Sequence, residues 1–117
     1  MEKINKWLNK FVVAWKSHDV DNVLKLFTED VEYWETPFKK VVDFDELKSE
    51  WEYVKNQTNI DVEYEVFSKN GDRYAVKWKL EYLNKNKVIK KFSGVYLIKL
   101  DLNSKCNYFF HCGESVK

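Results

Sequence analysis

Few side chains in this sequence could act as a nucleophile or a base, and two of them are neighbours. His111 directly precedes Cys112, and a histidine beside a thiol is the pairing used for nucleophilic catalysis. The stretch reads as a strand, however, and neighbouring strand residues point to opposite faces, so the two side chains are poorly placed to share a proton. Packed thiols are the favoured interpretation of Cys106 and Cys112. They lie six positions apart, roughly 20 Å along a strand, whereas a disulfide needs Cα atoms within about 7 Å.

His111 remains the best catalytic candidate. An imidazole in an aromatic cavity can titrate near neutral pH and serve as a general acid or base, and Glu32 could orient it. The alternative, which we favour, is a core or rim histidine satisfied by a hydrogen bond. The two His and two Cys do not have the spacing of a zinc site, and we expect neither a metal nor a cofactor.

Length and charge limit the class of protein. The 117 residues make a single domain, residues 1–117. Lys and Arg number 20 and Asp and Glu 19, so the chain lacks the basic surface that binds nucleic acid or an anionic membrane. No apolar run approaches the ~20 residues of a membrane span, and the N-terminus lacks the apolar region of a signal peptide. We therefore expect a cytoplasmic protein, and two free thiols fit a reducing compartment.

The first half of the chain is predicted to be mainly helical. Residues 4–15 carry apolar side chains three and four positions apart, as on one face of a helix. Asp19 is expected to cap a second, short helix that includes Phe27. Asp43, followed by Glu46 three positions later, has the spacing of a capping box and is expected to open a third helix.

The second half alternates with a period of two, which indicates strands. Asn70-Gly71 is a strong hairpin turn, because both residues tolerate a positive φ. Gly94 lies inside a long strand, where glycine often marks a bulge or bend. Helices followed by antiparallel strands indicate an α+β domain. The strands are expected over residues 31–36, 60–66, 74–82, 88–100 and 105–112.

Four short segments in this order resemble the nuclear transport factor 2-like superfamily, in its SnoaL-like branch. They are Phe11–Trp15, Tyr33–Phe38, Gly71–Trp78 and Phe92–Tyr96, and the resemblance runs from about Trp7 to His111. The resemblance implies a cone in which a curved antiparallel sheet packs on three N-terminal helices, with a cavity at the open end. Many members of this superfamily are homodimers, and their activities differ widely, so the fold alone does not name a reaction.

The resemblance also implies which side chains line the cavity. In relatives the residue before the proline of the first strand points inward, which would place Thr36 inside together with Trp34. Any single aromatic residue of this kind can equally be core packing. Together they suit a small, apolar or partly polar organic ligand. The expected lining is Phe11, Trp15, Trp34, Thr36, Tyr74, Trp78, Tyr82, Tyr96 and His111.

The catalytic groups of the better-known branches are missing at the matching positions. The resemblance implies an Asp base where this chain has Thr36, and an oxyanion-stabilising Tyr in register with Phe11. A threonine hydroxyl is no base near neutral pH, and a phenyl ring donates no hydrogen bond. The epoxide-hydrolase branch uses an Asp–Arg–Asp group. The only arginine, Arg73, has the opposite strand parity to Trp78 and is expected to point away from the cavity.

The later strands are apolar on both faces, and this predicts a partner. Val95 and Leu97 alternate with Tyr96 and Ile98, although a sheet with one face in water does not need a second apolar face. The simplest partner is a second copy, so we expect a homodimer through the outer sheet face.

Three functions are compatible with the sequence. The leading hypothesis is a SnoaL-like protein that binds a small organic ligand and lacks the matched catalytic residues of the family. The first alternative is an acid–base enzyme, of isomerase or dehydratase type, that uses His111 as its proton carrier. The second alternative is a dimeric protein-interaction module, which a cavity filled by side chains would favour.

Overall fold

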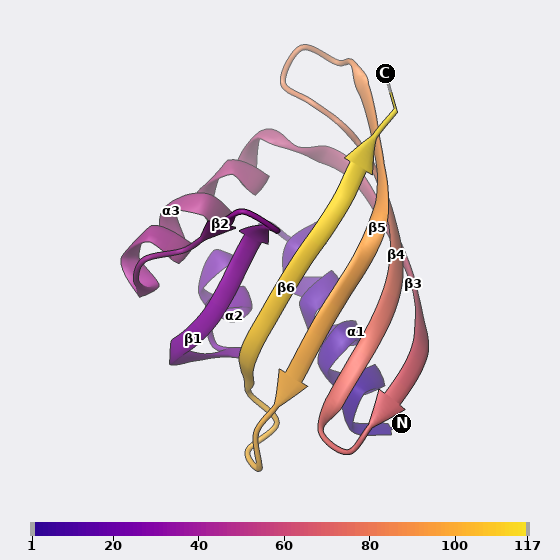
Figure 1. Cartoon of the computed structure of the whole chain (residues 1–117). Helices are drawn as coiled ribbons and strands as arrows, with labels where there is room; N and C mark the ends of the chain where they lie inside the picture. Colours follow the sequence, from indigo (N-terminus) through magenta and orange to yellow (C-terminus); the bar gives the residue numbers. More distant parts are fainter. Residues whose placement is uncertain (1, 117) are drawn as a thin grey trace.

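The computed structural model describes residues 2–116 and places helices on one side of a curved, unclosed sheet (Figure 1). This is the predicted α+β arrangement. None of the helices within residues 2–116 is long and apolar enough to cross a membrane. The elements are α1 (Glu2–Lys16), α2 (Val20–Leu24), β1 (Phe27–Thr36), β2 (Lys39–Lys40), α3 (Phe44–Glu52), the short helical turn η1 (Tyr53–Asn56), β3 (Thr58–Asn70), β4 (Arg73–Leu83), β5 (Ile89–Leu100) and β6 (Cys106–Ser115).

The strand order in the sheet is β2-β1-β6-β5-β4-β3. Strands β3 to β6 are antiparallel neighbours, and the predicted turn at Asn70-Gly71 joins β3 to β4, with Gly71 at φ +63°. Strand β1 pairs with β6 in the parallel direction, so the sheet is mixed rather than wholly antiparallel as expected. Parallel neighbours need a long crossover connection, and here α3 and β3 to β5 provide it.

The start of α3 is fixed by its own sequence, as the capping-box spacing predicts. The Asp43 side chain accepts a hydrogen bond from the Glu46 backbone N–H at 2.8 Å. The Glu46 carboxylate in turn accepts from the Val42 backbone N–H at 3.3 Å. Two free N–H groups near the helix start are therefore satisfied by local side chains.

Helix α2 is shorter than the sequence predicts. Asp19 caps it as expected and accepts from the Asn22 backbone N–H at 3.1 Å. The helix ends at Leu24, however, and Phe27 opens β1 instead of continuing the helix. The reason is tertiary, because the Phe27 ring is buried edge-on against Phe109 of β6, with centroids 5.6 Å apart.

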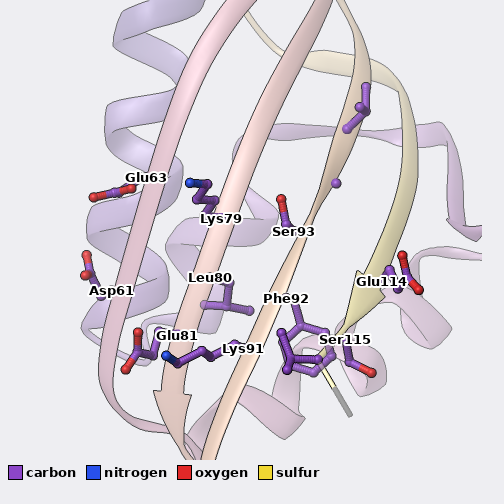
Figure 2. Close-up of a pocket in the computed structure, with 13 residues that line it drawn as sticks. Asp61, Glu63, Lys79, Leu80, Glu81, Lys91, Phe92, Ser93, Glu114 and Ser115 are labelled. Carbon is purple, nitrogen blue, oxygen red and sulfur yellow. The ribbon is translucent and has the colours of Figure 1, made fainter.

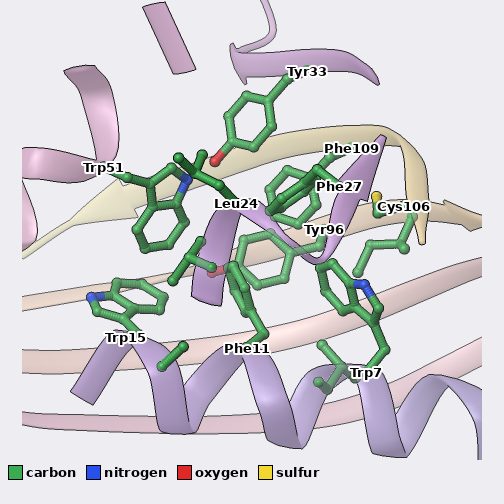
Figure 3. Packing of buried hydrophobic residues seen from close by; sticks show 14 of the residues in the cluster. Trp7, Phe11, Trp15, Leu24, Phe27, Tyr33, Trp51, Tyr96, Cys106 and Phe109 are labelled. Atoms are coloured by element: carbon green, nitrogen blue, oxygen red, sulfur yellow. The ribbon is translucent and has the colours of Figure 1, made fainter. Parts of the chain in front are cut away.

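Aromatic rings dominate the buried core (Figure 3). Tyr33 and Phe109 stack with centroids 4.8 Å apart, and Trp7 stacks on Phe11 at 5.1 Å. Each such pair contributes about 0.5–1.5 kcal/mol beyond the area that it buries. The Trp7 indole N–H is satisfied by the Leu26 carbonyl at 3.0 Å. This packing joins α1 to β1 and β6 and supports the site described below.

The other face of the sheet carries no helix (Figure 1). Val95 and Leu97 of β5 are 39% and 41% exposed there. Leu97 lies opposite Phe110 of β6, which in turn lies opposite Trp34 of β1. An apolar strip therefore crosses the middle of this face, and we call these four residues the outer strip.

Candidate functional site

A cavity of about 340 Å³ lies between α1, α3 and the helix-facing side of the sheet. This volume is at the lower end of the range of roughly 300–1,000 Å³ that is usual for small-molecule sites. Figure 3 shows the Tyr96 hydroxyl directed to the side on which Trp15 and Trp51 lie. The cavity is lined by Phe11, Trp15, Tyr33, Glu35, Glu50, Trp51, Val54, Gln57, Trp78, Leu80, Tyr82, Phe92, Tyr96, Phe109 and His111.

One wall of the cavity is an aromatic stack on β4, β5 and β6. Trp78 stacks on Tyr96 with centroids 5.1 Å apart and on His111 with centroids 5.2 Å apart. Gly113 gives the indole its room, since a Cβ at that position would lie 2.7 Å from Trp78 Cζ2. The planar wall therefore depends on a residue that has no side chain.

The facing wall comes from the helices. Trp15 of α1 and Trp51 of α3 meet edge to face with centroids 5.2 Å apart, and Phe11 meets Trp51 in the same way at 5.3 Å. The Trp15 indole N–H donates to Gln57 Oε1 at 2.9 Å. This hydrogen bond connects α1 to the segment that follows α3, and so it helps to fix the position of Trp15 in the wall.

His111 is half-buried and its orientation is fixed by the backbone of β1. Its Nδ1 lies 2.6 Å from the carbonyl oxygen of Glu35. A carbonyl can only accept, so Nδ1 carries the proton in the neutral ring and Nε2 is the acceptor. Nε2 has no hydrogen-bond partner within residues 2–116, which leaves it free for a ligand.

Two carboxylates meet at the edge of the cavity. Glu35 of β1 and Glu50 of α3 both reach Lys39 of β2, whose Nζ lies 3.1 Å from Glu35 Oε2 and 3.5 Å from Glu50 Oε1. The two side chains are 34% and 26% exposed. Burial raises the pKa of Glu50, the hydrogen bond and negative charge of Glu35 raise it further, and Lys39 opposes the shift. The Glu50 carboxyl is therefore protonated more readily than a free glutamate.

Three buried polar groups complete the site. Burial raises the pKa of the Tyr33 hydroxyl, although a hydrogen bond with the Trp51 side chain opposes the shift. Burial also raises the pKa of Tyr96 well above its ordinary value, so both phenols stay protonated at neutral pH. The Trp78 indole N–H has no acceptor in the part of the chain that the structure describes, although the residue is only 3% exposed. An acceptor on a ligand would relieve the cost of that unpaired donor.

A family model for the SnoaL-like domain matches residues 8–99, most of the chain. The chain belongs to the SnoaL-like family. Its structure is similar to that of a Delta 5-3-ketosteroid isomerase from Mycobacterium sp., with a TM-score of 0.80 at 14% identity, covering 97% of this chain and 98% of that one. The epoxide hydrolase/cyclase-like enzyme SalBIII, which has a role in pyran ring formation in the polyether salinomycin, is also similar, with a TM-score of 0.81 at 16% identity, covering 97% of this chain and 92% of that one.

A third similar structure is RV0760c from Mycobacterium tuberculosis in complex with estradiol-17beta-hemisuccinate. Its TM-score is 0.78 at 13% identity, and the match covers 92% of this chain and 91% of that one. No curated protein matches the chain in sequence. At these identities the solved structures show a shared fold, while the family model shows membership in the SnoaL-like family.

The structure brings six of the residues expected in the ligand site together around this cavity: Phe11, Trp15, Trp78, Tyr82, Tyr96 and His111. It places the other three, Trp34, Thr36 and Tyr74, outside this cavity. Tyr74 is buried near the β3–β4 turn, away from the cavity. Thr36 is exposed, and its hydroxyl accepts from the Phe38 backbone N–H at 3.2 Å.

Trp34 lies on the outer face of the sheet together with Glu32. The Trp34 indole N–H donates to Glu32 Oε2 at 2.8 Å, so Glu32 does not orient His111 as proposed. The physical reason is the parity of β1. Tyr33 is the buried residue, stacked on Phe109, and the alternation of the strand then turns Trp34 outward and Glu35 inward. The register also shifts between Trp34 and Thr36, where β1 meets β2.

The sequence reasoning missed the two carboxylates and Tyr33. A signal for Glu35 was available, because it shares its strand parity with the apolar Tyr33 and Val31. A weaker signal was available for Glu50, which directly precedes the predicted core residue Trp51 on the third helix. A charged residue at the border of an apolar helix face can line a cavity. Arg73 is exposed and lies outside the cavity, as predicted from its parity.

Larger hollows also occur, but few aromatic residues line them. One of about 730 Å³ lies along β3 to β6, where Glu63, Lys79, Glu81 and Lys91 line it (Figure 2). These charges are interspersed across the strands, with Glu63 opposite Lys79 and Glu81 opposite Lys91. Such a solvated charged surface is an ordinary feature of one sheet face, so the aromatic cavity is the candidate site.

Proposed function

We propose that this SnoaL-like protein binds a small organic molecule, mostly apolar with a few polar groups, in the aromatic cavity. The observation that carries this proposal is an unfilled space of about 340 Å³ between two aromatic walls. The free Nε2 of His111 and the unpaired Trp78 N–H offer one acceptor and one donor to such a ligand. The unfilled space also favours ligand binding over the alternative of a pure interaction module.

A thermal-shift screen tests the proposal. Planar hydrophobic compounds that enter the cavity are expected to raise the melting temperature, because they bind the folded state alone. Trp78→Phe is expected to reduce the shift, whereas Trp34→Phe, which changes a tryptophan on the other face, leaves it unchanged. If no hydrophobic compound in the screen raises the melting temperature, the chain has no binding role of this kind.

A second candidate function, an acid–base enzyme of isomerase or dehydratase type, is supported by the orientation of His111. The Glu35 carbonyl fixes the Nδ1–H tautomer, so Nε2 is the acceptor of an imidazole that lines the cavity. In an isomerisation Nε2 would take a proton from the carbon next to a carbonyl and return it to the far end of the shifted double bond, with no change in oxidation state.

Both reactions of this second candidate create a conjugated carbonyl that ultraviolet absorbance detects. The assay would use β,γ-unsaturated ketones and β-hydroxy ketones as substrates. His111→Gln is expected to lower the rate by about 100-fold or more, since glutamine keeps a donor for the Glu35 carbonyl but supplies no base. An equal rate in wild type and variant would exclude His111 as the proton carrier.

We further propose a cytoplasmic homodimer that associates through the outer strip. The partial exposure of Val95 and Leu97 supports the dimer, because contiguous apolar surface in the centre of a bare sheet face is typical of an interface. The unpaired thiols of Cys106 and Cys112 support a reducing compartment.

A further inference from the structure

The edge of the cavity holds a partly exposed ion cluster that comes from three different elements. Glu35 of β1 and Glu50 of α3 face each other, and the ammonium of Lys39 lies between them. Lys39 itself is 54% exposed and lies on a two-residue strand at the end of the sheet. Its long, largely solvated side chain is therefore free to withdraw, whereas the two carboxylates are held by the strand and the helix that carry them.

The same cavity is lined by a buried donor that lacks a partner in the described part of the chain. The Trp78 N–H, in a residue that is almost fully buried, has no acceptor among residues 2–116. Most of the remaining lining is aromatic, including the rings of Trp15, Trp51 and Tyr96. Aromatic faces attract cations, and a buried N–H attracts an oxygen acceptor.

We propose that the cavity takes a small organic cation, a protonated amine on an apolar and preferably aromatic body that also carries an oxygen. The ligand ammonium would lie between Glu35 and Glu50 in place of the Lys39 ammonium, and the ligand oxygen would accept from the Trp78 N–H. This inference rests on the proposed ligand-binding function and names the class of ligand for that same site.

Charge explains why a cation fits better than an anion or a neutral molecule. Two carboxylates within reach of one another repel, and a single exposed lysine compensates for only one of them. The cavity lining contains no Arg or Lys side chain that could pair with an anionic ligand. A bound ammonium would favour the ionised form of Glu50, and binding would release a proton wherever Glu50 is protonated in the free protein.

Titration calorimetry with three matched compounds tests the inference. Tyramine, tyrosol and phloretate share a hydroxyphenyl body and end in an ammonium, a hydroxyl and a carboxylate. Tyramine is expected to bind at least about tenfold more tightly than tyrosol, with phloretate weakest. Phenethylamine, which lacks the phenol oxygen, is expected to bind more weakly than tyramine because it leaves the Trp78 N–H unpaired.

Variants assign the effect to the cluster. Glu35→Gln and Glu50→Gln are each expected to reduce tyramine affinity about tenfold while tyrosol affinity changes little. Lys39→Gln is expected to increase tyramine affinity, since it removes the competing ammonium. Glu52→Gln is the matched control on the same helix, because Glu52 pairs with Lys55 at 2.7 Å and does not line the cavity. Proton release on tyramine binding, measured in buffers of different ionisation enthalpy, gives a readout that needs no variant.

The outcomes separate this inference from the proposed function. Equal affinity for tyramine and tyrosol, tighter binding of phloretate, or weaker tyramine binding in Lys39→Gln would each overturn the cation inference and leave the ligand-binding function intact. Binding of none of the compounds, together with a negative thermal-shift screen, would overturn both.

Discussion

Trp78 and Gly113 are the pair of residues on which the planar cavity wall depends. A Cβ at position 113 would lie 2.7 Å and 2.9 Å from two indole carbons, closer than atoms can approach. Gly113→Ala is therefore expected to push the Trp78 ring off Tyr96 and His111 and to lower the free energy of unfolding by about 1–3 kcal/mol. Urea denaturation measures this change. Ser115→Ala, an exposed change on the same strand, is expected to stay within about 0.5 kcal/mol. Unchanged stability in Gly113→Ala would contradict the close contact.

The raised pKa of Glu50 predicts how stability depends on pH. A carboxyl whose pKa is higher in the folded than in the unfolded state stabilises the fold at low pH, and that contribution is lost as the pH rises through the folded pKa. Glu50→Gln removes this titration, so the variant is expected to gain stability relative to wild type as the pH rises above about 4. The effect should stay below about 1 kcal/mol, because the side chain is partly exposed. Urea unfolding at several pH values measures it, and a difference that is independent of pH would contradict the raised pKa.

At the scale of single residues, the sequence predicts part of the site. The inward parity of Trp78, Tyr82 and Tyr96 follows from alternation along strands whose apolar face is unambiguous. Alternation in β1 was ambiguous, because Tyr33 and Trp34 are both aromatic and only one can face the core. Packing of Tyr33 on Phe109, a contact between residues far apart in the chain, decides between them. The contact between Glu35 and Glu50 joins two different elements and is likewise absent from any local pattern.

Among the elements, α3 contributes both to the carboxylate pair and to the aromatic wall, since it supplies Glu50 and Trp51. Its first turn depends on the Asp43 cap. Asp43→Ala is expected to lower the free energy of unfolding by about 1 kcal/mol and to weaken ligand binding by loosening the helix. Chemical denaturation and calorimetry measure the two effects. Asp45→Ala, in the same turn but without the capping hydrogen bond, is the control, and equal losses in both variants would show that the cap has no special role.

Element boundaries were predictable where local chemistry sets them. The Asp43 cap, the Asn70-Gly71 hairpin and the alternation of the strands that follow it act over a few residues. The predicted end of α2 is wrong. Phe27 has a spacing compatible with the helix, but it packs against Phe109 and belongs to β1. The parallel pairing of β1 with β6 could not be read from local patterns, since the two strands are separated by most of the domain.

At the scale of the whole molecule, the outer strip predicts self-association. Leu97→Lys places a charge in the middle of the proposed interface, opposite Phe110, and is expected to convert a dimer into a monomer. Sedimentation equilibrium measures the mass of each species. Leu102→Lys, the same change at an almost fully exposed turn residue, is the control and is expected to remain dimeric. A monomeric wild-type protein would contradict the proposal directly.

The position of β6 between β1 and β5 has a consequence for synthesis on the ribosome. Roughly 70 residues separate the end of β1 from the start of β6, and translation at about 5–20 residues per second takes several seconds to cover them. Throughout that interval the edge of β1 that β6 will cover has no strand to join, and the Glu35 carbonyl has no imidazole to bind. The nascent chain can form its hairpins early, but it can bind a ligand only after β6 has paired with both β1 and β5.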